Sequence, residues 1–210
     1  MTMAPPPGPV RCSPDSATCT LTVHGGGDPA RAEVEDFIRR IYAERFGARL
    51  DAFAPHLVAL RQDGAIVAAA GFRSAADGPL FLETYLAQTA DRLLSSQAGR
   101  GVERERIVEV GHLASNRAGM GRQLILMLGP LLAGEGFQWV VGTLTQELRR
   151  LFLRIGVVPL SLGAADPARL GGAAQHWGSY YEHHPVVLAG SLPQAMRHLR
   201  RYARATGAPA

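Results

Sequence analysis

The sequence predicts an α/β (α+β) fold with a mixed, mostly antiparallel central sheet flanked by helices. Two apolar runs, at residues 56–61 and 65–72, are joined by Gln62-Asp63-Gly64, and an Asp-Gly pair between such runs is a strong signal for an antiparallel hairpin. From residue 106 to 155 the order strand, helix, strand, helix predicts a parallel pair with a right-handed crossover. A sheet that holds both connections must be mixed.

The bulk composition fits one globular domain with tails. The chain has 210 residues, 47% of them hydrophobic, which is enough for a sizeable core. No run approaches the roughly 18 apolar residues that a bilayer crossing needs, and the start MTMAPPPGPVRC lacks the apolar centre of a signal peptide. We therefore expect a cytoplasmic protein.

Arginine supplies all 22 of the basic Lys and Arg positions, and the net charge is +4. The absence of lysine excludes Schiff-base and lysine-nucleophile chemistry. A GC-rich genome is the simplest cause of the preference for arginine over lysine, although the arginine guanidinium also forms paired hydrogen bonds with carboxylates and phosphates. Both cysteines, Cys12 and Cys19, lie near the N-terminus, so we expect neither a metal cluster nor a disulfide framework.

Residues 1–28 are predicted to be a disordered leader, because five prolines precede Asp15 and a glycine triplet follows. His24-Gly25-Gly26-Gly27 resembles the oxyanion-hole motif of some esterases, but no G-x-S-x-G nucleophile elbow follows it. A helix should begin at Asp28-Pro29, with Asp28 as the N-cap, and end near Phe46-Gly47. Its apolar side chains recur at helical spacing: Val34, Phe37, Ile38, Ile41 and Tyr42.

Residues 79–86, after the hairpin, are predicted to form a third strand. Alternation along it places Glu83 on one face with Phe81 and Tyr85, so that a carboxylate lies among apolar neighbours. Residues 87–97 are predicted to be helical, and residues 98–105 to be a polar loop.

The stretch 106–132, RIVEVGHLASNRAGMGRQLILMLGPLL, is the centre of the predicted fold. Residues 107–113 alternate as a strand, which puts Glu109 and His112 on opposite faces. A carboxylate on so apolar a strand should be partly desolvated, and its pKa should rise, which suits a proton acceptor. For His112 the favoured interpretation is a packed core histidine.

A glycine-containing turn, Asn116-Arg117-Ala118-Gly119-Met120-Gly121, leads from this strand into a long apolar helix. Glycine lets the backbone turn tightly, and the N–H groups of the first helical turn then point outward. These donors and the helix dipole favour an anion, with a phosphate as the natural candidate. The binding groups would be the N–H groups of Gly119, Met120, Gly121 and Arg122, together with the charge of Arg117.

Beyond residue 136 the sequence predicts a strand at 137–143, a helix at 146–155, an extended piece at 156–160, a helical turn at 166–170 and a strand at 186–189. Residues 193–205 should form a basic helix with Arg197, Arg200, Arg201 and Arg204. A solvated face is the simplest use of these charges, and the alternative is docking of an acidic carrier protein or an anionic membrane surface. We therefore divide the chain into the leader, a domain at 29–190 and a basic C-terminal helix and tail at 191–210.

The strand, turn and helix of this central stretch resemble the acyl-donor site of the GNAT acyltransferases, whose pyrophosphate loop is Q/R-x-x-G-x-G/A. Gly119 and Gly121 match its two glycines, and Asn116 stands at the first position in place of glutamine or arginine. The resemblance implies a GNAT-like fold with the parallel pair around the acyl-donor site. It also implies a donor bound as acyl-CoA or acyl-phosphopantetheine.

Longer runs are similar to the thermostable hemolysin family, which is GNAT-like and distantly similar to the acyl-homoserine-lactone autoinducer synthases. They lie within residues 37–190: FIRRIYAERFGARL, AAAGFRSA, LFLETYL, IVEVGHLAS, LRRLFLRIGVVPL and WGSYYEHHPVVLAG. The resemblance implies an N-acyltransferase that moves an acyl group from coenzyme A or acyl carrier protein to a small-molecule amine. The family's name records haemolysis, so the alternative is a membrane-active protein, acting directly or through an acylated surfactant-like product.

Acyl transfer to an amine requires the uncharged amine, and Glu109 and Glu83 are the candidate proton acceptors. Deprotonating a lysine-like amine at pH 7 costs about 4.6 kcal/mol, but an α-amine costs only about 1.4 kcal/mol. With an α-amine, the carboxylate would serve mainly to bind and orient the ammonium. The alternative for each glutamate is a structural ion pair with an arginine.

Other groups complete the predicted chemistry. GNAT enzymes often protonate the leaving thiolate with a late tyrosine, and Tyr180 and Tyr181 are the candidates here, although aromatic packing is their simpler use. Backbone N–H groups near Leu113, Ala114 and Ser115 would hold the oxyanion. We expect no metal, because the late histidines (His176, His183 and His184) lack ligand spacing. No nucleic-acid motif is present in the sequence.

Overall fold

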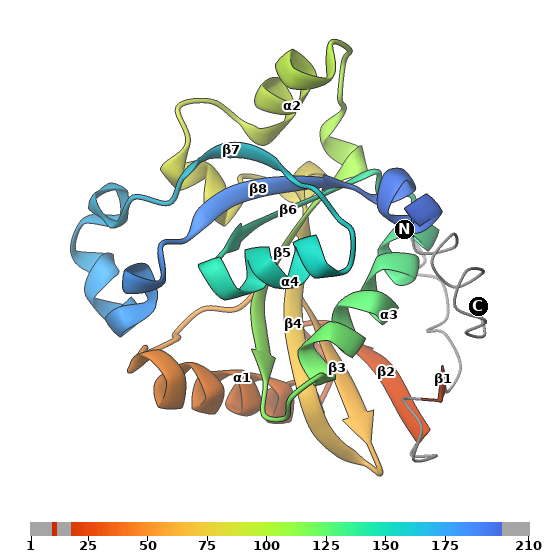
Figure 1. Ribbon diagram of the computed structural model, residues 1–210. Helices are drawn as coiled ribbons and strands as arrows, with labels where there is room; N and C mark the ends of the chain where they lie inside the picture. Colours follow the sequence, from red (N-terminus) through yellow and green to blue (C-terminus); the bar gives the residue numbers. More distant parts are fainter. Residues whose placement is uncertain (1–9, 12–17, 199–210) are drawn as a thin grey trace. The chain divides into compact units, whose positions relative to one another are not determined.

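The structure is a computed structural model that describes residues 10–11 and 18–198 (Figure 1). The described residues form two compact units, one from residues up to 73, 110–135 and 172–179, the other from residues 74–109, 136–171 and 180–198. Strand β5 (Ile107–Ser115) belongs to both units, since its first residues lie in the second unit and the rest in the first. Within the described ranges, no helix has the length and hydropathy that a bilayer crossing requires.

The first unit contains antiparallel strands in the order β1-β2-β3-β4. The predicted hairpin is confirmed, because Asp63 and Gly64 connect β3 to β4 with φ values of 52° and 83°, the positive values that such a two-residue turn requires. The strands are β1 (Val10–Arg11), β2 (Thr18–His24), β3 (His56–Gln62) and β4 (Ala65–Ser74).

Strand β2 corrects the prediction of a disordered leader through residue 28. It pairs with β3 from Cys19, opposite Gln62, to His24, opposite Leu57. Cys19 is buried and disulfide-bonded, which the sequence interpretation did not expect, and Cys12 lies outside the described residues. The composition was misleading because the hydrogen-bond partners of this strand come from β3, about forty residues later in the chain.

Helix α1 (Arg31–Phe46) confirms the predicted helix and its buried face, and it contacts β3. It begins slightly later than predicted, and Asp28 caps the turn before it, with Oδ1 accepting the Ala30 N–H at 2.8 Å. Oδ2 of Asp28 lies 2.8 Å from Nδ1 of His24, whose Nε2 lies 2.9 Å from the Thr22 hydroxyl. The His24 ring is therefore used to hold the start of α1.

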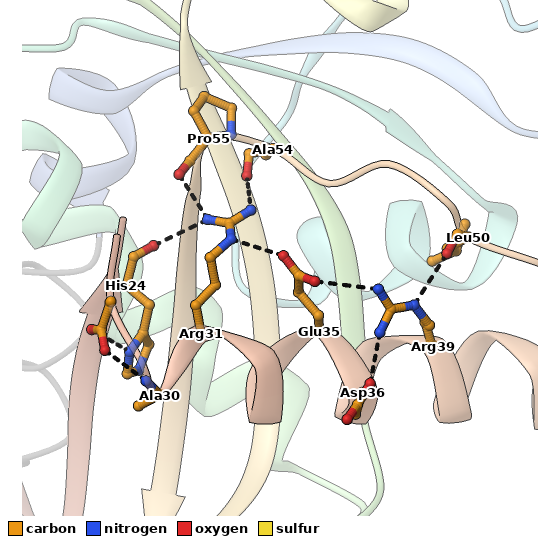
Figure 2. A network of polar contacts seen from close by, with 10 residues as sticks. His24, Ala30, Arg31, Glu35, Asp36, Arg39, Leu50, Ala54 and Pro55 are labelled. Carbon is orange, nitrogen blue, oxygen red and sulfur yellow. Dashed lines mark hydrogen bonds and ion pairs between the residues drawn. The ribbon is translucent and has the colours of Figure 1, made fainter. Parts of the chain in front are cut away.

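Arg31 fastens the first turn of α1 to the segment that precedes β3 (Figure 2). Its guanidinium donates to the carbonyls of Ala54 and Pro55, both at 2.8 Å, and to the Glu35 carboxylate at 2.8 Å. Only the planar fork of arginine reaches several acceptors in this way. These contacts hold the start of α1 against the segment that precedes β3.

Residues 172–179 return to the first unit at the C-terminal end of α1. The Ser179 hydroxyl donates to the Phe46 carbonyl at 3.3 Å, and a Cβ placed on Gly178 would lie only 2.0 Å from the same oxygen. Gly178 also has a φ of 51°. Both the space and the backbone conformation therefore require glycine.

The second unit contains the predicted parallel pair, in which β5 runs beside β6 with Glu109 opposite Val141. Strand β6 pairs antiparallel with β8, and β8 with β7. The strand directions are thus mixed and mostly antiparallel, which confirms the predicted fold class. This unit includes α2 (Ala90–Ala98), β6 (Trp139–Leu144), α4 (Gln146–Arg154), β7 (Leu160–Ala164) and β8 (Val186–Ser191).

The predicted strand at residues 79–86 is wrong, because Phe81–Tyr85 forms a 3-10 helix, η2. Two carboxylates accept its N-terminal N–H groups. Glu83 accepts the N–H of Leu80 at 3.0 Å, and Glu109 accepts those of Phe81 and Leu82 at 2.9 Å each. Alternation of apolar residues cannot predict this helix, because the N–H groups of Phe81 and Leu82 donate to Glu109, which lies far along the chain, and not to a neighbouring strand.

The C-terminal part differs from the predictions in extent. The helical turn expected at 166–170 is the start of a 3-10 segment, η4 (Pro167–His183). Strand β7 starts at Leu160, which is the last residue of the extended piece expected at 156–160. The structure has a helix from residue 192 to residue 198. The rest of the predicted basic helix, with Arg200, Arg201 and Arg204, falls outside the described residues.

Candidate functional site

The predicted donor loop lies at the surface of the first unit. Residues 116–119 are all exposed, and they connect the end of β5 to helix α3 (Met120–Gly134). Gly119 is the N-cap of α3, with a φ of 84°, a value that a residue with a Cβ adopts only under strain. The loop is open to solvent and is not covered by its own side chains.

Two backbone N–H groups in the first turn of α3 are available to a ligand. The Met120 N–H donates to the Arg117 carbonyl at 3.3 Å, and the Gln123 N–H to that of Gly119 at 3.0 Å. Between them, the N–H groups of Gly121 and Arg122 have no acceptor among the residues that the structure describes. Donors of this kind, at the positive end of a helix dipole, suit a phosphate.

The neighbouring side chains are compatible with that use. Arg117 is exposed and lies 3.2 Å from the Gln62 side chain, and Arg122 is exposed as well. A Cβ on residue 121 would lie 3.3 Å from the Ser115 hydroxyl, so that glycine keeps this corner open. The Asn116 N–H donates to the Val67 carbonyl at 3.2 Å and is therefore not available to a ligand.

Leu113, Ala114 and Ser115 end strand β5 in the first unit, as predicted, and only Ala114 of the three is buried. Their proposed oxyanion role remains a prediction. His112, just before them, has a φ of 52°, so the simple alternation predicted along the strand does not continue through it. The ring lies 5.3 Å from that of Phe53 and its Nδ1 is buried without a hydrogen-bond partner in the described part of the chain.

Burial lowers the pKa of His112 to about 4, with the charge of Arg73 acting in the same direction. The imidazole is therefore neutral near pH 7. A Cβ on Gly71 would lie 3.0 Å from its Nδ1, so the ring packs closely against the backbone of β4. The structure thus agrees with the interpretation of His112 as a packed histidine.

Glu109 lies in the second unit, and only 8% of its surface is exposed. Each of its carboxylate oxygens accepts one N–H of η2, from Phe81 and Leu82. An ionised carboxylate has about four lone-pair sites, so further acceptance is chemically possible. The contacts give Glu109 a structural role whatever else it does.

Glu83 makes the ion pair that was the alternative to a catalytic role. Its carboxylate lies 2.7 Å from the Arg104 guanidinium and also accepts the Ala90 N–H at 2.8 Å. Burial alone would raise the pKa of Glu83, but the Arg104 hydrogen bond and the backbone donors outweigh it and hold this pKa below its ordinary value. Arg104 also pairs with Asp91 at 2.9 Å.

The two candidate tyrosines have different partners in the second unit. The buried Tyr180 donates its hydroxyl to the Thr143 carbonyl at 3.2 Å. The Tyr181 hydroxyl lies 2.6 Å from that of Tyr85, at the end of η2. Burial raises the pKa of both Tyr85 and Tyr181, and the charge of Glu109 raises that of Tyr85 further.

Sequence reasoning missed Arg104, Tyr85 as a polar partner, and Thr143. The Thr143 hydroxyl is buried with no hydrogen-bond partner in the described ranges, although the carbonyl of the same residue accepts from Tyr180. No local pattern marks any of these three. The structure brings Tyr85, Tyr181 and Glu109 together in the second unit, while the donor loop lies in the first.

Solved structures of acyl-transfer enzymes share the fold. The chain is similar to the AHL synthase LasI, at 13% identity over 84% of this chain and 91% of that chain, with a TM-score of 0.58. It is similar to FeeM, an N-acyl amino acid synthase from uncultured soil microbes, at 13% identity over 87% and 95%, with a TM-score of 0.59. It is also similar to BjaI, a CoA-dependent acyl-homoserine lactone synthase solved with SAM and isopentyl-CoA, at 13% identity over 91% of each chain, with a TM-score of 0.60.

No curated protein sequence matches the chain significantly. The family model of thermostable hemolysins matches residues 24–196, which is most of the chain. This agrees with the resemblance carried by the motifs between residues 37 and 190. The chain therefore belongs to the thermostable hemolysin family.

Proposed function

We propose that the protein is an N-acyltransferase that moves an acyl group from a coenzyme A or acyl-carrier-protein thioester to the amine of a small molecule. The observation that carries the proposal is the exposed loop at residues 116–119, followed by the available N–H groups of Gly121 and Arg122. Supporting it, the same fold occurs in two AHL synthases and an N-acyl amino acid synthase. The thioester is the substrate that supplies the activated acyl group.

The residues present fit the phosphate groups of such a donor. The backbone donors would bind phosphate oxygens, and Arg117 and Arg122 would add charge-assisted bonds, each worth on the order of 1.5–3 kcal/mol. The Gly119 conformation and the small Gly121 let the phosphate approach the backbone closely. Leu113, Ala114 and Ser115 remain the proposed site for the oxyanion.

Glu109 is the carboxylate that we retain for the acceptor amine. Glu83 is held as a carboxylate by Arg104 and two backbone donors, so it is poorly suited to take a proton near neutral pH. An α-amine acceptor fits Glu109 better than a lysine-like amine, because only about 1.4 kcal/mol is then needed for deprotonation and the carboxylate has mainly to orient the ammonium.

The test is turnover by the purified full-length protein. A panel of acyl-CoA and acyl-carrier-protein thioesters is combined with a panel of small amines, and both free thiol and the amide product are measured. We expect amide formation with at least one pair, and a loss of donor affinity in Arg117→Met but not in the matched control Arg150→Met on α4. If no donor is turned over and none shifts the melting temperature, the proposal is wrong.

A second candidate function is association with an anionic membrane surface. Leu153 is 56% exposed and Val158 is 75% exposed, and the exposed arginines Arg150 and Arg154 lie close to them in the chain. Apolar side chains beside arginines suit a bilayer that contains acidic lipids. Sedimentation with vesicles of phosphatidylserine and phosphatidylcholine, but not with phosphatidylcholine alone, would support it. Binding that is unchanged in Leu153→Ser/Val158→Ser would count against this surface.

A further inference from the structure

Thr22, His24 and Asp28 form a chain of hydrogen bonds at the end of β2, in the first unit. The Thr22 hydroxyl lies 2.9 Å from Nε2 of His24, and Nδ1 of the same ring lies 2.8 Å from Oδ2 of Asp28. Thr22 and His24 are two residues apart in the strand, so their side chains project from the same face of the sheet. A hydroxyl, an imidazole and a carboxylate are therefore joined in that order.

The charge of Asp28 determines which nitrogen of the His24 ring carries the proton. The hydrogen bond from the Ala30 N–H, and then that from His24, hold the pKa of Asp28 below its ordinary value, so the group is a carboxylate near pH 7. A carboxylate can only accept, so Nδ1 of His24 donates to it, and Nε2 of the neutral ring then has a lone pair. The Thr22 hydroxyl donates to this lone pair, since the Ala59 carbonyl, at 3.4 Å, is the more distant acceptor.

The surrounding contacts hold the His24 ring in this orientation. The residue is buried, with 5% of its surface exposed, and Arg31 donates to its backbone carbonyl at 3.4 Å (Figure 2). Asp28 is held in turn, because its Oδ1 accepts the Ala30 N–H at 2.8 Å. Since neither group has to be reoriented, Nε2 remains directed at the Thr22 hydroxyl and is ready to take its proton.

The hydroxyl end of the chain is accessible to a small molecule. Thr22 is half-buried, and Gly26 and Gly27, in the turn that joins His24 to Asp28, are exposed. A Cβ on either glycine would have no atom within 4 Å, so the turn is open. The N–H groups of both glycines have no acceptor in the described part of the chain. A small ester would therefore meet a hydroxyl beside its base and a turn with available donors.

We propose that Thr22 is a nucleophile toward small activated carboxylic esters, with His24 as its general base and Asp28 as the group that orients the base. A nucleophile within hydrogen-bond distance of a base, which a third group orients, is the arrangement that activates a hydroxyl. Oγ1 of Thr22 attacks the ester carbonyl carbon while its proton passes to Nε2 of His24. The C–O bond to the alcohol then breaks, the alcohol takes the proton from Nε2, and the acyl group stays on Thr22. Water, activated in the same way, releases the carboxylic acid and restores the hydroxyl, so that ester and water give acid and alcohol.

The test uses 4-nitrophenyl acetate and the purified full-length protein. Release of nitrophenolate gives the rate, and mass spectrometry of acid-quenched, digested protein locates the acetyl group, which is easily assigned because the chain has no lysine. We expect acetylation of Thr22 in the wild type and none in Thr22→Val. Asp28→Asn keeps an oxygen for the Ala30 N–H but removes the charge that orients His24, so it should slow acetylation by about 100-fold or more.

Two further variants separate nucleophilic attack from effects on folding. Thr20→Val is the matched control, because Thr20 lies on the same face of β2, two residues before Thr22, and it should keep the wild-type rate. Thr22→Ser keeps the hydroxyl and should still be acetylated, and Thr22→Ala replaces Thr22→Val if that variant does not fold.

The rate decides when the acetyl group is released too quickly to accumulate. Release of nitrophenolate at the wild-type rate in Thr22→Val, acetylation at the wild-type rate in Asp28→Asn, or an equal loss in Thr20→Val would each overturn the inference. None of these results affects the proposed acyltransferase, which is tested separately with thioesters and amines.

Discussion

Replacing Glu109 with glutamine should destabilise the protein even before any activity is measured. The carboxylate accepts two backbone N–H groups of η2, at 2.9 Å each, in a site that is 8% exposed. A glutamine side chain offers one oxygen and one NH2 group, so one of the two N–H donors loses its acceptor and faces another donor. Losing one hydrogen bond to a buried charged group costs about 1.5–3 kcal/mol.

Urea unfolding followed by circular dichroism gives the change in the free energy of unfolding. Glu105→Gln, an exposed glutamate close by in the chain, is the control and should stay within about 0.5 kcal/mol of the wild type. Amide hydrogen exchange supplies a local readout, because the Phe81 and Leu82 amides should exchange faster in Glu109→Gln. If the variant unfolds at the wild-type urea concentration and both amides keep their protection, Glu109 does not hold η2 and the argument fails.

Four further changes test other parts of the structure. Gly119→Ala places a Cβ on a residue with a φ of 84°, which should lower the free energy of unfolding by about 1–2 kcal/mol, measured by urea unfolding. The same variant should bind coenzyme A more weakly in a calorimetric titration, and tighter binding would contradict the proposed donor loop. Thr143→Val removes a buried hydroxyl that lacks a partner among the described residues, so the melting temperature should stay the same or rise, and a clear fall would mean that the hydroxyl is bonded. His112 has a folded pKa of about 4 against an ordinary 6.5, a difference that corresponds to at most about 3.4 kcal/mol. The free energy of unfolding should therefore fall as the pH drops from 6.5 to 4. His112→Asn, which tolerates positive φ, should flatten that pH dependence in urea titrations. The pKa of Glu83 is lowered in the folded protein, so the carboxylate stabilises the fold above pH 4.5, and this stabilisation is lost as the pH falls through the folded pKa. Arg104→Met should remove this acid dependence of stability. An unchanged midpoint of acid unfolding would contradict the ion pair.

The parts of the fold that local signals determine could be predicted from the sequence. The Asp63-Gly64 turn, the apolar face of α1 and the strand, helix, strand order around residue 107 depend on neighbouring residues, and the structure has all three. Strand β2 could not be predicted, because its pairing partner β3 lies far along the chain. The segment at 79–86 has strand-like alternation, but Glu109, more than twenty residues later, accepts its N–H groups.

The same distinction applies to the candidate site. The donor loop was predictable, since glycine spacing and the start of a helix lie within a few residues of one another. The Tyr85–Tyr181 pair was not, because each tyrosine by itself has the pattern of a packing residue and only the tertiary structure brings the hydroxyls together. The ion pair of Glu83 with Arg104 was considered as a general alternative for each glutamate, but the identity of the arginine came from the structure.

Gly178 has a practical consequence for anyone who engineers this protein. The position is exposed, and a substitution scan planned from surface accessibility alone would treat it as permissive. Any side chain there would collide with the Phe46 carbonyl and disturb the last turn of α1. Labelling sites, loop insertions and library positions should therefore avoid residue 178, and its intolerance in a saturation library would be a simple check of how residues 172–179 meet that helix.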